Sequence, residues 1–235
     1  MAAETQKTTV VEVRSLSPSV RELVLAVEEP VAFQPGQWLS LHLPIGQKPP
    51  LVRAYSMAQP PSPPGQLVLA FDRVPGGLGS GYLWNIVEGD TLMLAGRYGT
   101  FLAPDPLMQE LLLIARYTGI VPIRCILTAL FAAPPSWKVT LIYGAPNREE
   151  LIYHDEFVAL ASRHQSFRYE TILLQGEGPV GDDTRPELER VVSLFGSRKD
   201  FFPMVCGVKA FVHPLRSYFK ERGFGRREAR YETYD

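Results

Sequence analysis

The chain has few of the residues that build disulfides or metal sites. Its 235 residues include two cysteines, Cys125 and Cys206, and four histidines. Two widely spaced cysteines form neither a disulfide framework nor a zinc site nor an iron–sulfur cluster. The histidines show no metal-ligand spacing, and no catalytic triad can be argued. The sequence therefore predicts no metal site, and a reduced, cytoplasmic setting is expected.

Long apolar runs and an excess of one charge are also missing. No apolar run reaches the roughly 18 to 20 residues that span a bilayer, so no membrane span is expected. Residues 1–9 are polar and do not read as a secretory segment. Lys and Arg total 24 against 25 Asp and Glu, a net charge of -1. This balance gives no general attraction to nucleic acid or to an anionic membrane.

What the chain does have is enough apolar sequence for a core, with 46% hydrophobic residues. The first half reads as short strands with Pro-Gly turns between them, which indicates an antiparallel barrel or sandwich. A short helix is expected around residues 82–87. The strands are expected over residues 8–13, 20–27, 37–43, 66–74 and 91–95.

The second half changes character. The apolar run 110–115 reads as a strand buried on both faces. Strands that alternate with helices indicate a parallel α/β sheet. Residues 175–184 read as a loop. Further strands are expected over 138–143, 167–174 and 202–206, and helices over 120–132, 155–164, 185–194 and 210–222. The boundary at Ala103-Pro104-Asp105-Pro106 predicts two domains, 1–104 and 105–235.

The most informative stretch is Arg53-Ala54-Tyr55-Ser56. In an extended segment alternate side chains share a face, so Arg53 and Tyr55 can meet one ligand together. Arg suits a phosphate through its planar fork, and Tyr suits a planar ring by stacking. Ser56 adds a small hydrogen-bonding group. The set fits a flavin nucleotide, which carries both a phosphate and a fused ring.

A glycine-rich run, Gly76-Gly77-Leu78-Gly79-Ser80-Gly81, supports this interpretation. Its glycines permit positive φ and close approach of the backbone to a ligand. If a helix opens directly after the run, its free N–H groups would attract phosphate, and Ser80 would add a hydroxyl donor. A flexible surface hairpin is the alternative. Beside the flavin motif, phosphate binding by Leu78, Gly79 and Ser80 is favoured.

Taken in order, these motifs resemble the ferredoxin–NADP reductase superfamily over nearly the whole chain. The matching segments are residues 53–56, 77–83, 96–101, 118–122, 151–157 and 205–207. The resemblance implies a β + α/β fold: an N-terminal antiparallel FAD-binding barrel, then a parallel-sheet NAD(P)-binding domain. It implies a flavin-dependent oxidoreductase that passes electrons from NAD(P)H through bound FAD to a separate acceptor, such as a small redox protein. FMN is the less favoured flavin.

The resemblance also implies roles for single residues in the flavin half of the site. Arg53 would hold the flavin phosphate, and Tyr55 would pack on the isoalloxazine ring. Ser56 would reach the N5 edge, which takes up hydride. The flavin carries the hard chemistry, and the protein positions it.

In the nucleotide half, Thr118, Gly119 and Gly207 are similar to nucleotide-binding residues of the family. Cys206 would lie near the site of hydride transfer, although a buried inert thiol is an equal alternative. Glu232 resembles an acidic residue close to the flavin, and Tyr231 or Tyr234 could cover the ring face.

The nucleotide loop departs from its family at Arg116 and Tyr117, where two glycines usually stand. The missing glycine normally lets the backbone approach pyrophosphate. A tyrosine there disfavours positive φ by roughly 1 kcal/mol or more and is predicted to narrow the pyrophosphate space. Arg116 either pairs with phosphate or turns toward solvent or the flavin domain. The rival function is therefore a flavin-binding electron-transfer or regulatory subunit that no longer uses NAD(P)H directly.

The sequence gives only weak indications of nucleotide preference and of a docking surface for a partner. Leu174-Gln175 and Pro146 stand where a 2′-phosphate clamp is common, so NAD is slightly favoured over NADP. Basic residues are enriched near the C-terminus, and a solvated helix face is favoured over a dock for an acidic electron-transfer protein. They are Lys209, Arg216, Lys220, Arg222, Arg226, Arg227 and Arg230.

Overall fold

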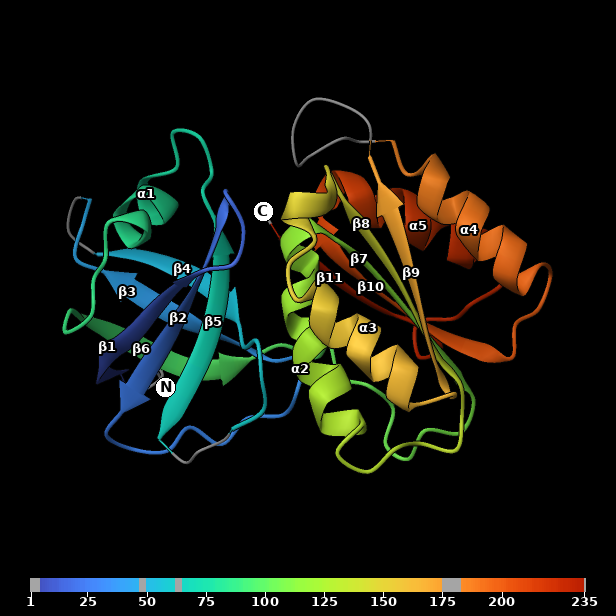
Figure 1. The fold of residues 1–235 in the computed structure, drawn as a ribbon, viewed down its shortest axis with the longest axis horizontal. Helices are drawn as coiled ribbons and strands as arrows, with labels where there is room; N and C mark the ends of the chain where they lie inside the picture. Colours follow the sequence, from blue (N-terminus) through green and yellow to red (C-terminus); the bar gives the residue numbers. More distant parts are fainter. Residues whose placement is uncertain (1–4, 47–49, 62–64, 175–182, 235) are drawn as a thin grey trace.

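The structure is a computed structural model that describes residues 5–46, 50–61, 65–174 and 183–234. The chain forms an antiparallel sheet and a parallel sheet that lie side by side, with helix α2 between them (Figure 1). Residues 175–182 of the expected loop lie outside the described residues. None of the helices in the described part of the chain is long and apolar enough to cross a membrane.

The first sheet has six antiparallel strands in the order β4-β3-β6-β1-β2-β5. The strands are β1 (Thr5–Ser15), β2 (Val20–Val27), β3 (Trp38–Leu43), β4 (Leu51–Ser56), β5 (Gln66–Asp72) and β6 (Thr91–Tyr98). Just beyond β4, Met57 pairs with Leu69 of β5, and the Ala58 amide donates to the Val68 carbonyl at 2.7 Å. These contacts join the two edge strands, so the sheet closes and the predicted antiparallel barrel is confirmed.

Helix α1 (Leu78–Trp84) differs from the prediction of a helix over residues 82–87. It begins within the glycine-rich run, because Gly79 packs closely on β4: a β-carbon there would lie 3.2 Å from the Arg53 Cγ. Glycine disfavours helices in isolation, and tertiary packing overrides that preference here. The helix is consequently placed directly beside the predicted flavin motif.

The second sheet has five parallel strands in the order β11-β10-β7-β8-β9, which confirms the predicted parallel α/β sheet. The strands are β7 (Glu110–Arg116), β8 (Val139–Ala145), β9 (Phe167–Leu173), β10 (Phe201–Val208) and β11 (Arg230–Tyr234). β11 was not predicted, because its polar, half-exposed sequence lacks the apolar run of a central strand.

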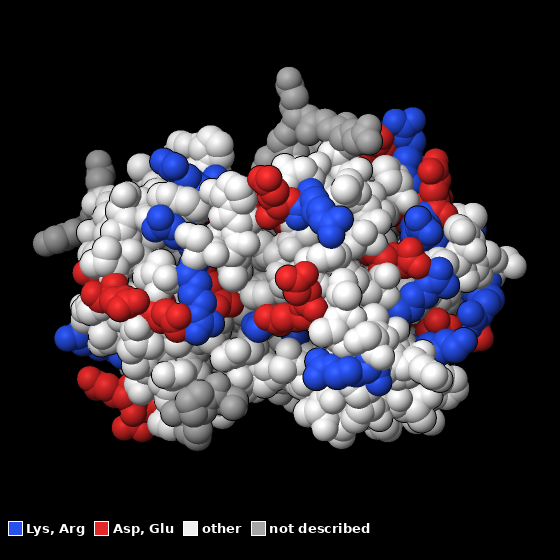
Figure 2. All heavy atoms as spheres, viewed as in Figure 1, with Lys and Arg blue, Asp and Glu red and all other residues white. Residues whose placement is uncertain are grey.

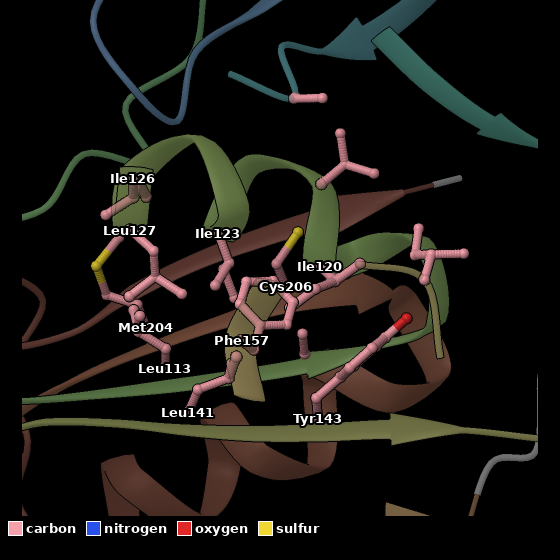
Figure 3. Close-up of a cluster of buried hydrophobic side chains, with 14 of the residues drawn as sticks. Leu113, Ile120, Ile123, Ile126, Leu127, Leu141, Tyr143, Phe157, Met204 and Cys206 are labelled. Carbon is pink, nitrogen blue, oxygen red and sulfur yellow. The ribbon is translucent and has the colours of Figure 1, made fainter. Parts of the chain in front are cut away.

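Helices cover both faces of this sheet. They are α2 (Ile120–Leu130), α3 (His154–Arg163), α4 (Arg185–Phe195) and α5 (Lys209–Glu221). α2 and α3 share one apolar cluster with the sheet, and α4 and α5 share the other. In Figure 3 the labelled side chains of α2, among them Ile123 and Leu127, point onto the strands. The α2 cluster continues into the barrel through Val24, Ala58 and Val68, so one core joins the two sheets.

Candidate active site

A cleft of about 500 Å³ lies between the barrel and the parallel sheet. It collects predicted residues from both halves of the chain, namely Arg53, Ala54, Tyr55, Ser56, Leu78, Gly79, Ser80 and Thr118. Four other predicted residues do not line it: Gly119, Cys206, Gly207 and Glu232. Tyr234, one of the two tyrosines expected near the ring face, also lines the cleft, whereas Tyr231 does not. Asp72, which was not predicted, lines it as well.

Strand β4 presents the flavin motif to this cleft. Arg53 is exposed, Tyr55 is half-buried and Ser56 is buried. The Tyr55 ring meets Phe71 edge-on, with ring centroids 6.3 Å apart. Burial raises the pKa of Tyr55 to about 12, so its phenol stays protonated near neutral pH. β4 thus offers an exposed cation, a fixed aromatic ring and a hydroxyl, a set that fits a flavin nucleotide.

The Ser80 hydroxyl helps to hold the turn before α1. It accepts a hydrogen bond from the Val74 amide at 3.1 Å and lies 3.4 Å from the Gly77 carbonyl. Ser80 is therefore engaged by its own backbone, and its predicted contact with phosphate stays a prediction. The turn itself lies at the cleft, where Val74, Gly77 and Leu78 form part of the wall.

Tyr234, in the edge strand β11, connects the two sheets at Ser56, the last residue of the flavin motif. Its hydroxyl lies 3.1 Å from the Ser56 hydroxyl and close enough to the Cys206 thiol for the two groups to affect each other's pKa. Cys206 is fully buried, and this burial raises the pKa of its thiol well above the ordinary value. Cys206 therefore meets the cleft only through Tyr234, in line with Figure 3, where it lies among apolar side chains.

Glu232 stands opposite Cys206 in the parallel pairing of β10 and β11. It is half-buried, and desolvation raises the pKa of its carboxyl from 4.5 to about 7. The carboxyl is therefore half protonated near neutral pH in the folded chain, although it lies outside the cleft lining.

The raised pKa of Glu232 predicts a pH effect on stability. Between pH 4.5 and about 7 the folded chain holds a proton that the unfolded chain releases, so this group's stabilising contribution is lost as pH rises through the window. Glu232→Gln should remove that part of the slope. Urea unfolding of parent and variant at several pH values measures it, and identical pH slopes in the two proteins would contradict the assignment.

Arg116 ends β7 and lies at the cleft, and its predicted pairing with phosphate stays a prediction. It is 2% exposed, and its guanidinium holds both carboxylate oxygens of Glu187, at 3.0 and 2.6 Å. It also donates to the Asp183 carbonyl at 2.7 Å and lies over the Phe211 ring, 4.6 Å from its centroid. The expectation that Arg116 turns toward solvent or toward the barrel is wrong.

The physical reason is Glu187 in α4, which is fully buried and needs a cationic partner. Gly144 in β8 makes room for it, because a β-carbon there would lie 2.5 Å from the carboxylate. Glu187 carries no signal in the sequence beyond an acidic residue in a helix's first turn, so the pair could not be predicted.

Tyr117 follows Arg116 and adopts φ of 52°, the left-handed region that glycine favours. Its ring is buried at the cleft wall, and its hydroxyl hydrogen-bonds Ser19 in the turn between β1 and β2. Ser17 and Ser19 each donate to a Glu150 carboxylate oxygen at 2.6 Å. Tyr117 therefore joins the nucleotide loop to the barrel, and its predicted interference with pyrophosphate stays a prediction.

Gly119 lies against the end of β10. A β-carbon on it would come within 2.2 Å of the Cys206 carbonyl oxygen and 2.9 Å of the Gly207 Cα. Only glycine permits this approach, so Gly119 and Gly207 hold the loop after β7 onto β10 and do not line the cleft.

The C-terminal arginines divide between two environments. Arg216 and Arg222 lie over the rings of Tyr231 and Tyr218, at 5.7 and 4.7 Å. A second hollow, of about 960 Å³, is lined in part by Arg226, Arg227 and Arg230. On the face seen in Figure 2, basic and acidic side chains are interspersed.

The described residues contain no group of three or more His, Cys, Asp or Glu side chains that could hold a metal ion.

Comparison with known proteins agrees with this geometry. An oxidoreductase FAD-binding domain matches residues 7–102, and an oxidoreductase NAD-binding domain matches residues 113–216. The chain is 36% identical to ferredoxin–NADP reductase B of Sorangium cellulosum, over 99% of both chains. It is 31% identical to the reductase component DmpP of a Pseudomonas phenol 2-monooxygenase, over 91% of this chain and 54% of that protein.

Solved structures share the fold. The cytochrome P450 reductase GcoB of Amycolatopsis matches with a TM-score of 0.81 and 27% identity, over 98% of this chain and 69% of that one. A ferredoxin–NADP+ reductase from Neisseria gonorrhoeae, solved with FAD and NADP, matches with a TM-score of 0.83 and 22% identity, over 98% and 99% of the chains. With the paired domains and the full-length relative, the chain belongs to the ferredoxin–NADP reductase superfamily.

Proposed function

We propose that this chain is a flavin-dependent oxidoreductase that passes electrons from NAD(P)H through bound FAD to a separate acceptor. The observation that carries the proposal is the shared cleft. Strand β4 presents Arg53, Tyr55 and Ser56 from one side, and Thr118 of the nucleotide loop faces them from the other. A hydride donor and a flavin need this proximity, because reacting atoms must approach to about 3–3.5 Å.

The residues of the cleft would act by binding and orientation. Arg53 would hold the flavin phosphate, and Tyr55 would support the ring. The Ser56 hydroxyl, oriented by Tyr234 at 3.1 Å, would present a hydrogen bond to the edge of the ring. Bound FAD would supply hydride uptake and stepwise release of single electrons. FAD is favoured over FMN because the matching domain is described as FAD-binding.

The acceptor is proposed to be a separate redox protein. Relatives include a ferredoxin–NADP reductase and proteins named as the reductase components of a monooxygenase and a dioxygenase, which supports a separate protein acceptor. We also assign residues 1–104 and 105–235 to the two domains, since the barrel ends at Tyr98 and the parallel sheet begins at Glu110. A cytoplasmic location is proposed because both cysteines are free and buried.

Anaerobic mixing with NADH or NADPH tests the function. Bleaching of the flavin absorbance by either nucleotide is expected. The rival, a flavin-binding subunit that does not use NAD(P)H, is favoured by Arg116 and Tyr117 in place of glycines. It predicts that dithionite bleaches the flavin while both nucleotides leave it oxidised. The same traces give the nucleotide preference. NADH is slightly favoured, because Pro146 and Leu174 stand where a 2′-phosphate clamp is common.

Substitution of Arg53 by alanine should weaken FAD binding. Loss of a charge-assisted contact to phosphate removes about 1.5–3 kcal/mol, which is about 10- to 150-fold in the dissociation constant. Titration of the apoprotein with FAD, followed by flavin fluorescence, measures the change. Lys7→Ala, which removes an exposed charge from β1, serves as the control and should bind FAD like the parent. Equal affinities for Arg53→Ala and the parent would remove Arg53 from the site.

A further inference from the structure

Asp72, the last residue of β5, is a charged group in the cleft that the proposed function does not yet use. One carboxylate oxygen accepts a hydrogen bond from the Thr118 hydroxyl at 3.4 Å, across the junction of the two sheets. Among the described residues, no Lys or Arg forms an ion pair with Asp72. A carboxylate has about four acceptor positions, so one long hydrogen bond leaves most of them for a ligand.

The surroundings of Asp72 are acidic and rich in hydroxyls. Burial raises the pKa of the Asp72 carboxyl, and the nearby Glu150 carboxylate adds to that rise. The same two carboxylates add to the raised pKa of Tyr117, whose main cause is burial. The nearest loop cation, Arg116, is held by Glu187 at 2.6 Å. A phosphate in contact with Asp72 would therefore face carboxylates, which repel it.

A ligand group that suits this corner carries no negative charge and both donates and accepts hydrogen bonds. Asp72 is an acceptor, and the Thr118 hydroxyl is a donor as well as an acceptor. A primary carboxamide has the complementary pair, with N–H donors and a carbonyl acceptor on one carbon. In a nicotinamide nucleotide this group lies on the ring that gives up hydride. Tyr55 and Ser56 line the same cleft, so a ring held by Asp72 would lie beside the proposed flavin position.

Building on the proposed function, we propose that Asp72 and Thr118 bind the carboxamide of the nicotinamide ring and so select and orient the hydride donor. Asp72 accepts from the carboxamide N–H, and the Thr118 hydroxyl turns its single proton from Asp72 to the carboxamide carbonyl oxygen. Asp72 is then a specificity-determining residue, because a nucleotide without the N–H leaves a desolvated carboxylate unsatisfied.

The test uses a donor that lacks only this N–H group. Flavin reduction is measured anaerobically with NADH or NADPH, whichever is faster, and with the reduced 3-acetylpyridine analogue of the same nucleotide. The kcat/KM with the natural nucleotide is divided by the kcat/KM with its acetylpyridine analogue, and this ratio is compared between the parent and Asp72→Ala. The ratio should fall by about tenfold or more in Asp72→Ala, since a hydrogen bond to a charged acceptor is lost. The intrinsic difference in reduction potential between the nucleotides is common to both proteins and cancels.

Three further variants separate recognition from disturbance of the fold. Asp72→Asn keeps an acceptor oxygen and should give an intermediate ratio. Thr118→Val should slow flavin reduction by both nucleotides equally and leave the ratio unchanged, because both nucleotides keep the carbonyl to which Thr118 donates. Glu29→Ala removes an exposed carboxylate of the barrel and should match the parent.

The outcomes distinguish this inference from the function on which it rests. If the parent flavin is reduced by NAD(P)H and Asp72→Ala leaves the ratio unchanged, carboxamide recognition by Asp72 is wrong and the proposed function stands. If no nicotinamide nucleotide reduces the parent flavin, the proposed function fails and the inference falls with it. A lowered ratio in Asp72→Ala with normal FAD content supports both.

Discussion

Arg116→Met should lower the free energy of unfolding by about 3–5 kcal/mol, the usual cost of removing one partner of a buried ion pair. Glu187 would be left as an unpaired carboxylate in the interior, where its side chain is 0% exposed. Glu187→Leu should destabilise the chain by a similar amount, because the Arg116 guanidinium would then lose both of its carboxylate contacts. Urea unfolding followed by circular dichroism gives the values.

The double variant Arg116→Met/Glu187→Leu should recover most of the lost stability, since apolar residues of similar volume often replace a buried pair without loss. Arg185→Met provides the control. Arg185 is exposed and pairs with Asp183 at the surface, so its loss should change the unfolding free energy by less than about 1 kcal/mol. A loss below about 1 kcal/mol for Arg116→Met would show that the buried pair does not form in solution.

The buried pair changes how the nucleotide loop should be tested. Replacing Arg116 by glycine would have two effects. It would remove a side chain at the cleft, and it would leave Glu187 buried without its cationic partner. A gain in nucleotide binding could then be hidden by loss of folded protein. Both residues line the cleft, but Tyr117 is the better single site because the Arg116 guanidinium is bound by the buried Glu187 of α4.

The sequence was sufficient where a local pattern decides the structure. Leu39, Leu41 and Leu43 alternate with less buried residues along β3, as a half-buried strand requires. The apolar run of β7 is buried on both faces, as a central parallel strand requires. In β4, Arg53 and Tyr55 do share one cleft, but Ala54 and Ser56 line it as well, so alternation alone does not account for the site.

The sequence was insufficient where contacts between distant segments determine the structure. Arg116 and Glu187 are 71 residues apart, and nothing near either one predicts that they meet. α1 begins earlier than predicted because Gly79 packs on β4. The position of a residue at the end of a strand also does not show whether its side chain faces the cleft. Cys206 is buried under α2, and its proximity to Tyr234 depends on an edge strand that was not predicted.

Tyr117→Gly is expected to strengthen nicotinamide-nucleotide binding by about tenfold or more, roughly 1.4 kcal/mol. Removal of the ring widens the cleft wall beside Thr118 and lets the backbone approach pyrophosphate. The variant should also be less stable. Loss of a buried aromatic side chain costs about 3–5 kcal/mol, and relief of the left-handed φ of 52° returns about 1–2 kcal/mol of that.

Tyr117→Phe separates the ring from its hydroxyl. It keeps the ring in the cleft wall and loses only the hydrogen bond to Ser19, which should destabilise the chain by about 0.5–1.5 kcal/mol. Obstruction by the ring predicts that glycine tightens binding and phenylalanine does not. If instead the link to Ser19 limits nucleotide entry, both variants bind more tightly. Dissociation constants come from anaerobic titration, and rates of flavin reduction from stopped flow. A parent that already binds NAD(P)H at low micromolar concentration, about -8 kcal/mol, with no gain in Tyr117→Gly, would show that the ring leaves the pyrophosphate space open.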